Sequence, residues 1–342
     1  MRCGAACVIK GKSLRSSYKR LLRILLTLTF VALIVWQVGG LGQIVAAMQR
    51  MEPLYMVLVI VVLTLDRVLM TYKWGLLLHL RGLHLPLWRG VQMYCAAMIW
   101  GMFLPSTVGA DAVRTVSAAR SGLPLGEVAA SIVIERMLGF LSALVLALCS
   151  LTLLSWLGAL EERFAPLWWL ALALLAGALG AFSASFSQRA YLLIHERLLV
   201  RFRESGAMVR LRRFHETYRA YRGHKAGMAV FFGLSFGEQL LPILHSWLIA
   251  LGMGIDVGLL FVAGAVPLAL LIARIPVSID GLGVYDGMFM LLMALAGVSP
   301  AESVAIAMIG RILQIVAWLP WWAAYVLGSG SLRPKPLDQL PE

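Results

Sequence analysis

The stretch GLPLGEVAASIVIER, residues 122–136, has a counterpart later in the chain, GVSPAESVAIAMIGR, residues 297–311. The counterpart starts 175 residues downstream, and an ungapped alignment of the two stretches has five identities in fifteen positions. These identities include Glu127 with Glu302 and Arg136 with Arg311. Five matches are weak support in so apolar a chain. The hypothesis of a repeated helical element therefore needs other features at corresponding positions.

Composition places the chain in a membrane. Of its 342 residues, 61% are hydrophobic and 14% are charged, and its mean hydropathy is +0.85. Soluble proteins contain roughly 45–50% apolar residues. Three runs without a charged residue, 24–49, 137–160 and 164–188, each exceed the ~20 residues that a helix needs to cross the hydrocarbon core. We therefore expect an all-α, polytopic integral membrane protein.

The placement of the basic residues explains the net charge of +13. Seven of the 30 Lys and Arg precede residue 24, and ten more lie between residues 188 and 226. Cytoplasmic flanks of membrane helices collect Lys and Arg, so both stretches are predicted to face the cytoplasm, and the charge requires no nucleic acid. The prediction is a multi-pass protein of a bacterial-type cytoplasmic membrane with a cytoplasmic N-terminus.

The same charges divide the chain into a basic tail at 1–23, a transmembrane domain at 24–328 and a cytoplasmic tail at 329–342. Within the domain, the basic loop 187–226 carries an apolar stripe at helical spacing, formed by Tyr191, Ile194, Leu198 and Phe202. This pattern favours an interfacial helix on an anionic lipid surface. A solvated cytoplasmic loop is the alternative.

About eight transmembrane helices are expected, together with re-entrant or broken helices. The candidate segments are 24–44, 53–72, 91–104, 128–157, 165–186, 227–250, 257–274, 284–297 and 303–327. Residues 91–120 are predicted to form a re-entrant hairpin that opens to the cytoplasm, because an outward crossing would put Arg114 and Arg120 on the wrong side. Residues 284–297 are expected to cross so that the C-terminal tail lies inside, although about 14 residues rise only ~21 Å.

A Pro-then-Gly break precedes each copy of the repeated stretch. The residues of the two breaks are Pro105 and Gly109, then Pro276, Gly281 and Gly283. Proline cannot continue a helix, and glycine loosens the turn that follows. Broken helices at corresponding positions of two halves are typical of inverted-repeat transporters with a binding site near the midplane. The breaks therefore support the repeat.

Ionisable residues inside apolar segments indicate where function could lie, because each costs roughly 2.5–3.5 kcal/mol to insert. They are Asp66, Arg67, Glu135, Arg136, Glu238, His245, Arg274, Asp280, Asp286 and Arg311. Asp111 and Arg114, three residues apart, share a helix face at the first break. Arg136 and Arg311 are predicted to lie deep in their helices, where a guanidinium can bind a lipid phosphate through paired donors. The alternative is a structural ion pair, with Glu135 or Glu238 as the partner.

Enzyme signatures are absent from the sequence. It contains no phosphate-binding loop, no nucleophile elbow, no zinc-protease motif and no metal-ligand spacing among its four cysteines. We therefore expect neither enzymatic activity nor a cofactor or metal. A membrane-embedded lipid or glycosyl transferase is the alternative if a metal brings four acids together, namely Asp111, Asp280, Asp286 and Glu238.

Four motifs in order resemble the transmembrane-domain family of lysylphosphatidylglycerol synthase, a flippase-like family. They are LPSTVGADAVR at 104–114, the two repeated stretches, and RIPVSIDGLGVYDGMF at 274–289, and the resemblance covers residues from about 20 to 328. It implies a membrane lipid translocase. In that family aminoacyl transfer belongs to a soluble C-terminal domain, so we expect no lysyl-lipid synthesis from this chain.

The resemblance also implies headgroup-binding positions at the two breaks. The first family pattern, Gly-Asp/Glu-x-x-Arg, falls on Ala110, Asp111 and Arg114, whereas the second break has Tyr285 where an Arg is usual and Asp286 where a Glu is usual. The predicted function is a carrier that moves an anionic or amphiphilic lipid, such as a phospholipid, hopanoid or polyprenyl-linked lipid, between leaflets. A non-transporting partner of a lipid-modifying enzyme is a further alternative, and the sequence leaves the oligomeric state open.

Overall fold

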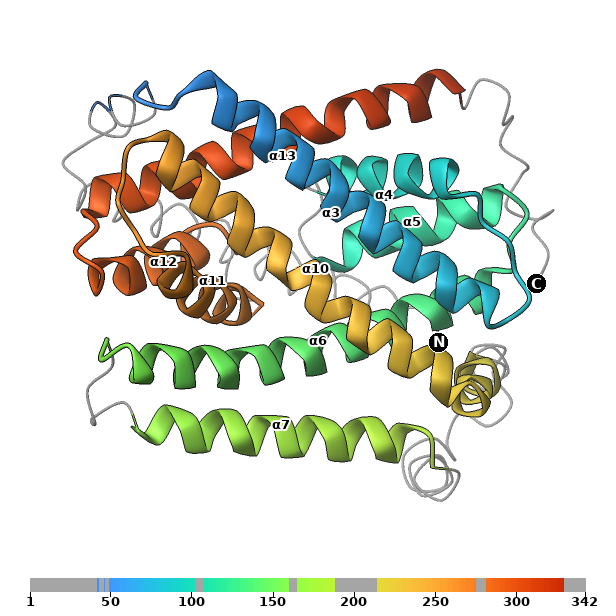
Figure 1. Ribbon diagram of the computed structural model, residues 1–342. Helices are drawn as coiled ribbons and strands as arrows, with labels where there is room; N and C mark the ends of the chain where they lie inside the picture. Colours follow the sequence, from blue (N-terminus) through green and yellow to red (C-terminus); the bar gives the residue numbers. More distant parts are fainter. Residues whose placement is uncertain are drawn as a thin grey trace, which may run out of the picture.

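The computed structural model describes residues 42, 46, 49–101, 107–159, 165–187, 214–274 and 281–328, and they form a bundle of helices (Figure 1). The helices are α3 (Pro53–His79), α4 (Leu87–Gly101), α5 (Thr107–Arg120), α6 (Leu125–Trp156), α7 (Ala165–Ser185), the short η3 (Tyr221–Gly223), α10 (Lys225–Gly252), α11 (Leu259–Ala273), α12 (Val284–Ala294) and α13 (Pro300–Gly328). Among the described residues, the five helices α3, α6, α7, α10 and α13 are long and apolar enough to span a membrane. The expected all-α polytopic membrane protein is confirmed.

Two helical hairpins lie between the long helices. Helix α4 packs against α5, and α11 packs against α12. The first hairpin agrees with the one predicted for residues 91–120. The expected crossing by residues 284–297 is wrong, because α12 has only 11 residues, which rise ~16 Å, and it folds back on α11. If α11 and α12 form a hairpin that enters and leaves the membrane on the same side, the C-terminal tail still lies on the side that the crossing predicted.

Close backbone approach and positive φ angles shape the hairpins. A Cβ atom on Gly101, the last residue of α4, would lie 2.7 Å from the Cβ of Ala110 in α5. Gly281 and Gly283 have φ angles of 70° and 79°, and Gly283 is the residue that precedes α12. L-residues with a side chain rarely adopt such angles, which explains the glycines at the second break. Gly109 lies inside α5 rather than in the break, and Pro105 and Pro276 lie outside the described residues.

Helix order and packing recur at the 175-residue offset of the two sequence stretches. The run α3-α4-α5-α6 corresponds to α10-α11-α12-α13, and α6 and α13 start at equivalent positions, Leu125 and Pro300. Within each run the first helix packs on the second and fourth, the second on the third, and the third on the fourth. Between the runs α4 packs on α13 as α6 packs on α11, and α3 packs on α13 as α6 packs on α10. Helix α7 has no counterpart in this scheme.

The equivalent helices α3 and α10 lie side by side along their length and run in opposite directions (Figure 1). Where α3 begins, the backbone N–H of Glu52 donates a 2.8 Å hydrogen bond to the carbonyl of Gly252, at the end of α10. At the other end, a Cβ on Gly227 in the first turn of α10 would lie 2.5 Å from the side chain of Leu80, just after α3. Glycines at both ends thus allow the two helices to approach closely.

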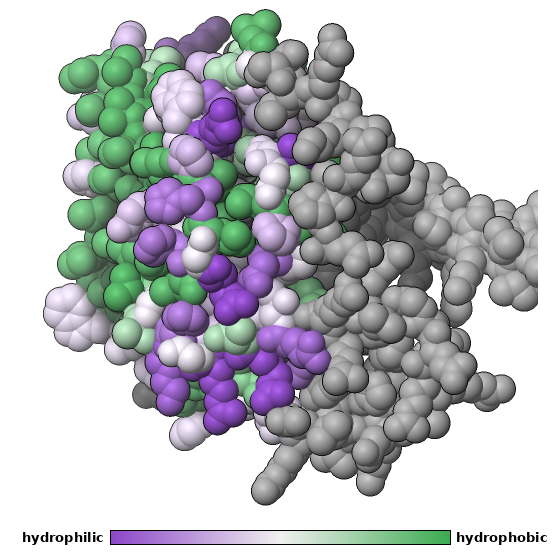
Figure 2. Space-filling model, turned by 90° about the vertical axis from the view of Figure 1, so that its right-hand side faces the viewer, coloured by the Kyte–Doolittle hydropathy of each residue, from purple (hydrophilic) through white to green (hydrophobic). Residues whose placement is uncertain are grey.

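The end of the bundle where α3 ends and α10 begins is polar. Figure 2 shows hydrophilic side chains across this end and apolar ones along the side of the bundle. Exposed cations here include Arg89, Arg120, Arg222 and Lys225. Arg81 donates two 2.9 Å hydrogen bonds to Glu127, tying the end of α3 to the start of α6, and this contact raises the pKa of Arg81 above its ordinary value. The positive-inside rule predicts that this end faces the cytoplasm.

Candidate functional site

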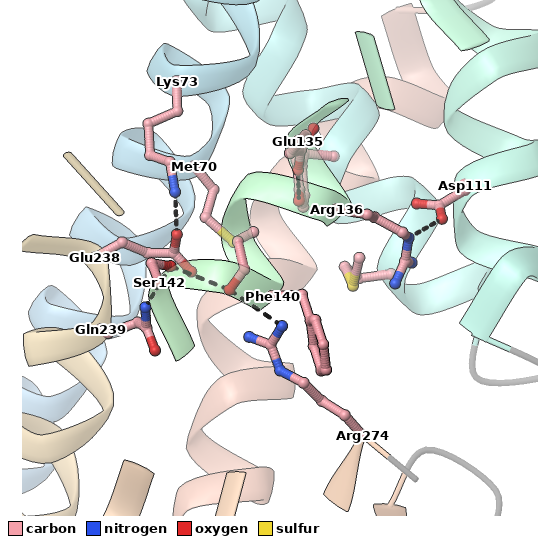
Figure 3. A pocket seen from close by; sticks show the side chains of 13 residues that line it. Met70, Lys73, Asp111, Glu135, Arg136, Phe140, Ser142, Glu238, Gln239 and Arg274 are labelled. Atoms are coloured by element: carbon pink, nitrogen blue, oxygen red, sulfur yellow. Dashed lines mark hydrogen bonds and ion pairs between the residues drawn. The ribbon is translucent and has the colours of Figure 1, made fainter. Parts of the chain in front are cut away.

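A pocket of ≈ 460 Å³ lies between α3, α4, α5, α6, α10 and the end of α11 (Figure 3). It is lined by Met70, Lys73, Tyr94, Met98, Asp111, Glu135, Arg136, Gly139, Phe140, Ser142, Glu238, Gln239 and Arg274. Five of the site residues proposed from the sequence are among them: Asp111, Glu135, Arg136, Glu238 and Arg274. In Figure 3 the Asp111–Arg136 and Lys73–Glu238 pairs lie on opposite sides of the pocket, with Arg274 and Phe140 between them.

Arg136 binds Asp111 from the first hairpin, through its Nε atom. The side chain of Arg136 is 51% exposed, whereas that of Asp111 is only 16% exposed. Arg114 lies 3.9 Å from the same carboxylate, as the three-residue spacing predicted. The sequence-based choice of Glu135 or Glu238 as the partner of Arg136 is wrong. Both acids bind other cations.

Glu135 binds the buried Arg114 through two hydrogen bonds of 2.8 and 3.1 Å. The hydroxyl of Tyr94 donates a third hydrogen bond to this carboxylate, at 2.9 Å. The Arg114 guanidinium also lies over the rings of Trp74 and Tyr94, at 4.7 and 4.6 Å. A bidentate pair whose guanidinium also contacts two aromatic rings is a stable way to bury two charges. Arg114 therefore forms a wall behind the pocket.

Glu238 of α10 binds Lys73 of α3, so this ion pair joins the two antiparallel helices. The candidate segment 53–72 ended just before Lys73, whereas this residue is buried inside α3, which continues to His79. Its ammonium group also lies 4.6 Å from the centre of the Phe231 ring. Next to the pair, Gln239 donates a 2.8 Å hydrogen bond to Ser142 of α6. This side of the pocket offers neutral polar groups beside the ion pair.

Arg274, directly after α11, is the remaining cation of the pocket. Its side chain donates a 3.3 Å hydrogen bond to the carbonyl of Gly139, and it has no ion pair within the described part of the chain. The lining acids are Asp111, Glu135 and Glu238, and the bases that bind or line the site are Lys73, Arg114, Arg136 and Arg274. Three negative and four positive charges leave a net charge of +1.

The second copy of the repeat carries an ion pair of its own, away from this pocket. Arg311 donates to both carboxylate oxygens of Asp286, at 3.2 and 3.3 Å, and its guanidinium lies 5.8 Å from the centre of the Tyr285 ring. The backbone N–H of Gly283 also donates to Asp286, at 2.8 Å. The four acids that could have held a metal therefore do not all meet at the pocket. Asp280 lies outside the described residues.

Sequence reasoning missed several pocket residues. Lys73 was visible as a cation that directly follows an apolar run, but Tyr94, Phe140, Ser142 and Gln239 carry no signal of their own in a chain so rich in such residues. Asp66 and Arg67, two of the ionisable residues that the sequence places in apolar segments, bind each other with a 2.9 Å hydrogen bond. It does not line the pocket.

The fold and pocket define a polytopic helical membrane protein with two short hairpins and a charged internal site. Residues 20–321 match the family described as the lysylphosphatidylglycerol synthase TM region, and the chain belongs to this family. It is also 31% identical over 160 residues to a UPF0104 membrane protein of Methanothermobacter thermautotrophicus. That alignment covers 45% of this chain and 44% of the relative, so the chain spans under half the length of the curated relative it matches.

Proposed function

We propose that this protein moves a lipid with an anionic headgroup between the two leaflets of its membrane. The observation that carries the proposal is a charged pocket lined by membrane helices and by the α4/α5 hairpin. Charged groups inside membrane proteins mark pathways for polar substrates, because each is costly to insert. A pocket of ≈ 460 Å³ lies in the range of small-ligand sites, so it has room for a headgroup while the acyl chains stay in the bilayer.

An inverted repeat supports transport rather than simple binding. The antiparallel contact of α3 with its equivalent α10 gives the two runs of helices opposite directions across the membrane. The same offset relates Asp111 to Asp286 and Arg136 to Arg311, and each Asp binds its Arg. Halves of opposite orientation can exchange conformations and so expose a central site to one leaflet and then the other.

The arrangement of the acids favours transport without chemical change to the lipid. Glu135 accepts hydrogen bonds from both Arg114 and Tyr94, and Glu238 and Asp111 are bound to cations. Because each of these carboxylates is bound to a cation, none of them is arranged to accept a proton from a substrate as a general base. The sequence-based expectations of a cytoplasmic N-terminus, a cytoplasmic-type membrane and an anionic lipid surface at loop 187–226 remain parts of this proposal.

Filling the pocket tests the proposal without changing any charge. Gly139 lines the pocket, and a Cβ at this position would meet nothing within 4 Å, so a Phe side chain can extend into the cavity. Gly177 in α7 also has nothing within 4 Å of its Cβ position and is far from the lining residues, so Gly177→Phe is the matched control. The purified chain is placed in vesicles that contain an acyl-labelled fluorescent anionic phospholipid, and loss of outer-leaflet signal to dithionite reports movement.

We expect Gly139→Phe to slow lipid movement about tenfold or more, because the headgroup no longer fits, whereas Gly177→Phe keeps the wild-type rate. Equal rates for the two variants, or a wild-type rate no higher than that of protein-free vesicles, would refute the proposed function. Chemically altered lipid recovered from these vesicles would instead support the transferase alternative.

A further inference from the structure

We infer that the pocket selects a lipid phosphodiester whose headgroup carries hydroxyl groups and no amine, such as a phosphoglycerol or a phosphosugar. This inference rests on the proposed function and names the substrate class of the same site. Two observations support it: the acids of the pocket are already bound to cations, and some donor and acceptor atoms have no hydrogen bond within the described residues.

An amine-bearing headgroup finds no suitable acid in the pocket. Glu135 is held by Arg114 in a bidentate contact and also accepts from Tyr94. Glu238 binds Lys73, whose side chain is only 3% exposed, so this lysine cannot move to water without leaving a cavity. At Glu135 or Glu238 an ammonium group would have to displace Arg114 or Lys73 and leave a buried cation without its ion pair, which is strongly unfavourable. At the third acid, Asp111, it would lie beside the buried Arg114, which is 3.9 Å from the same carboxylate.

A phosphate, by contrast, meets a cation that no acid among the described residues neutralises. Within that part of the chain Arg274 donates one hydrogen bond, to a backbone carbonyl at 3.3 Å, which leaves most of its five donors for a ligand. Arg136 faces the same pocket, and half of its side chain is exposed although it binds Asp111. One phosphodiester charge balances the net charge of +1. The guanidinium geometry suits two phosphate oxygens at once.

The opposite side of the pocket suits hydroxyl groups. Gln239 uses its NH2 group to bind Ser142, so its carbonyl oxygen remains as an acceptor that receives no hydrogen bond from the described residues. Ser142 in turn donates to the carbonyl of Gly139, at 3.1 Å. Phe140 is 38% exposed and lies beside Arg274 (Figure 3), where its ring can cover the C–H face of a polyol. Hydroxyls of a headgroup can therefore donate to Gln239 while the phosphate binds Arg274.

Three acyl-labelled lipids separate the requirements of the site. Phosphatidylglycerol carries the charge and hydroxyls, phosphatidylmethanol carries the charge alone, and phosphatidylethanolamine carries an amine. In vesicles with the full chain we expect phosphatidylglycerol to move about tenfold faster than phosphatidylethanolamine, with phosphatidylmethanol between them. Arg274→Gln should abolish the preference over phosphatidylethanolamine. Gln239→Leu should reduce the ratio of phosphatidylglycerol to phosphatidylmethanol rates to about one, and Arg120→Gln, at the polar end of the bundle, is the control for losing an arginine.

Lipid binding gives a second measurement that does not depend on transport. The purified chain is equilibrated with an equal mixture of phosphatidylglycerol and phosphatidylethanolamine, and the lipid it retains is identified by native mass spectrometry. Enrichment of phosphatidylglycerol that Arg274→Gln removes supports the inference even if no lipid moves, in which case only the proposed function is refuted. Equal retention and equal movement of the two lipids would overturn the selectivity while leaving translocation intact.

Discussion

Arg311 binds Asp286 across 25 residues of sequence, and the side chain of Asp286 is only 2% exposed. Asp111 and Arg136 are also 25 residues apart and also bind each other. The two pairs are thus the same contact in two copies, related by the 175-residue offset. They differ in exposure, since the Arg311 side chain is 25% exposed and that of Arg136 is 51% exposed. From this difference we infer that the less exposed Arg311 stabilises the fold, whereas the more exposed Arg136 binds the lipid headgroup.

Removing Arg311 should destabilise the protein. Arg311→Ala leaves the buried Asp286 without its cation, and breaking a buried pair costs about 3–5 kcal/mol. We expect a lower melting temperature in detergent and a lower folded yield. The double variant Arg311→Ala with Asp286→Asn should recover most of the loss, because the asparagine oxygen can still accept from Gly283 without a charge. A double variant no more stable than the single one would contradict a structural pair.

Removing Arg136 should impair transport more than stability. In Arg136→Ala the carboxylate of Asp111 still has Arg114 at 3.9 Å, so no charge is left isolated. We expect a melting temperature close to that of the wild type, with anionic lipid movement slowed about tenfold or more in vesicles. Arg136→Lys keeps the charge but loses the paired donors, so an intermediate rate is expected. Wild-type transport by a folded Arg136→Ala protein would remove this arginine from the headgroup path.

The two copies should start on opposite sides of the membrane. Ser121 and Ala296 are equivalent under the 175-residue offset and lie just before α6 and α13. Single cysteines at these positions in a cysteine-free variant should therefore react with an impermeant thiol reagent from opposite faces of oriented vesicles, Ser121→Cys from the cytoplasmic face. Labelling of both from one face would disprove the inverted repeat, whatever the protein transports.

The helix breaks could be predicted because proline and glycine act locally. Gly281 and Gly283 adopt positive φ angles, and the short helix α11 ends before that break and α12 begins after it. The path of the chain around the second break was mispredicted for a physical reason. The positive-inside rule fixes only the side on which flanking charges lie, and a crossing or a hairpin satisfies it equally.

Ion-pair partners could not be predicted, because they depend on packing between distant helices. Adjacency in sequence does not decide the pairing, because the adjacent Asp66 and Arg67 bind each other, whereas Glu135 is bound by Arg114 from α5. Arg136 instead meets Asp111 because the α4/α5 hairpin packs beside α6. The predicted segment ended before Lys73 because a charge near the end of an apolar run indicates the end of a membrane helix. Its partner Glu238 comes from a helix 165 positions away.

Changing one member of the buried Arg114–Glu135 pair should destabilise the protein more than changing both. Glu135→Met removes both hydrogen bonds to the guanidinium of Arg114, which is 2% exposed, and leaves it only the Asp111 carboxylate at 3.9 Å, so a loss of about 3 kcal/mol is expected. Replacing both residues by Met should be less destabilising than the single change, because apolar side chains of similar volume carry no unpaired charge. Equivalent positions in the second copy are in fact uncharged, Phe289 and Gly310. Melting temperatures of the three proteins in detergent measure this coupling.

The close contact of Gly101 with Ala110 should be required for the α4/α5 hairpin. A Cβ on Gly101 would lie 2.7 Å from that of Ala110, so Gly101→Val forces α4 and α5 apart, and overpacking of this kind costs about 1–3 kcal/mol. We expect a lower melting temperature and slower lipid movement, because Asp111 is carried by α5 and would shift away from Arg136. Gly177→Val is the matched control, since that glycine also lies in a helix and has open space around it. The double variant Gly101→Val with Ala110→Gly removes the clashing methyl group and should restore part of both losses. If Gly101→Val behaves like Gly177→Val, the hairpin does not depend on this contact.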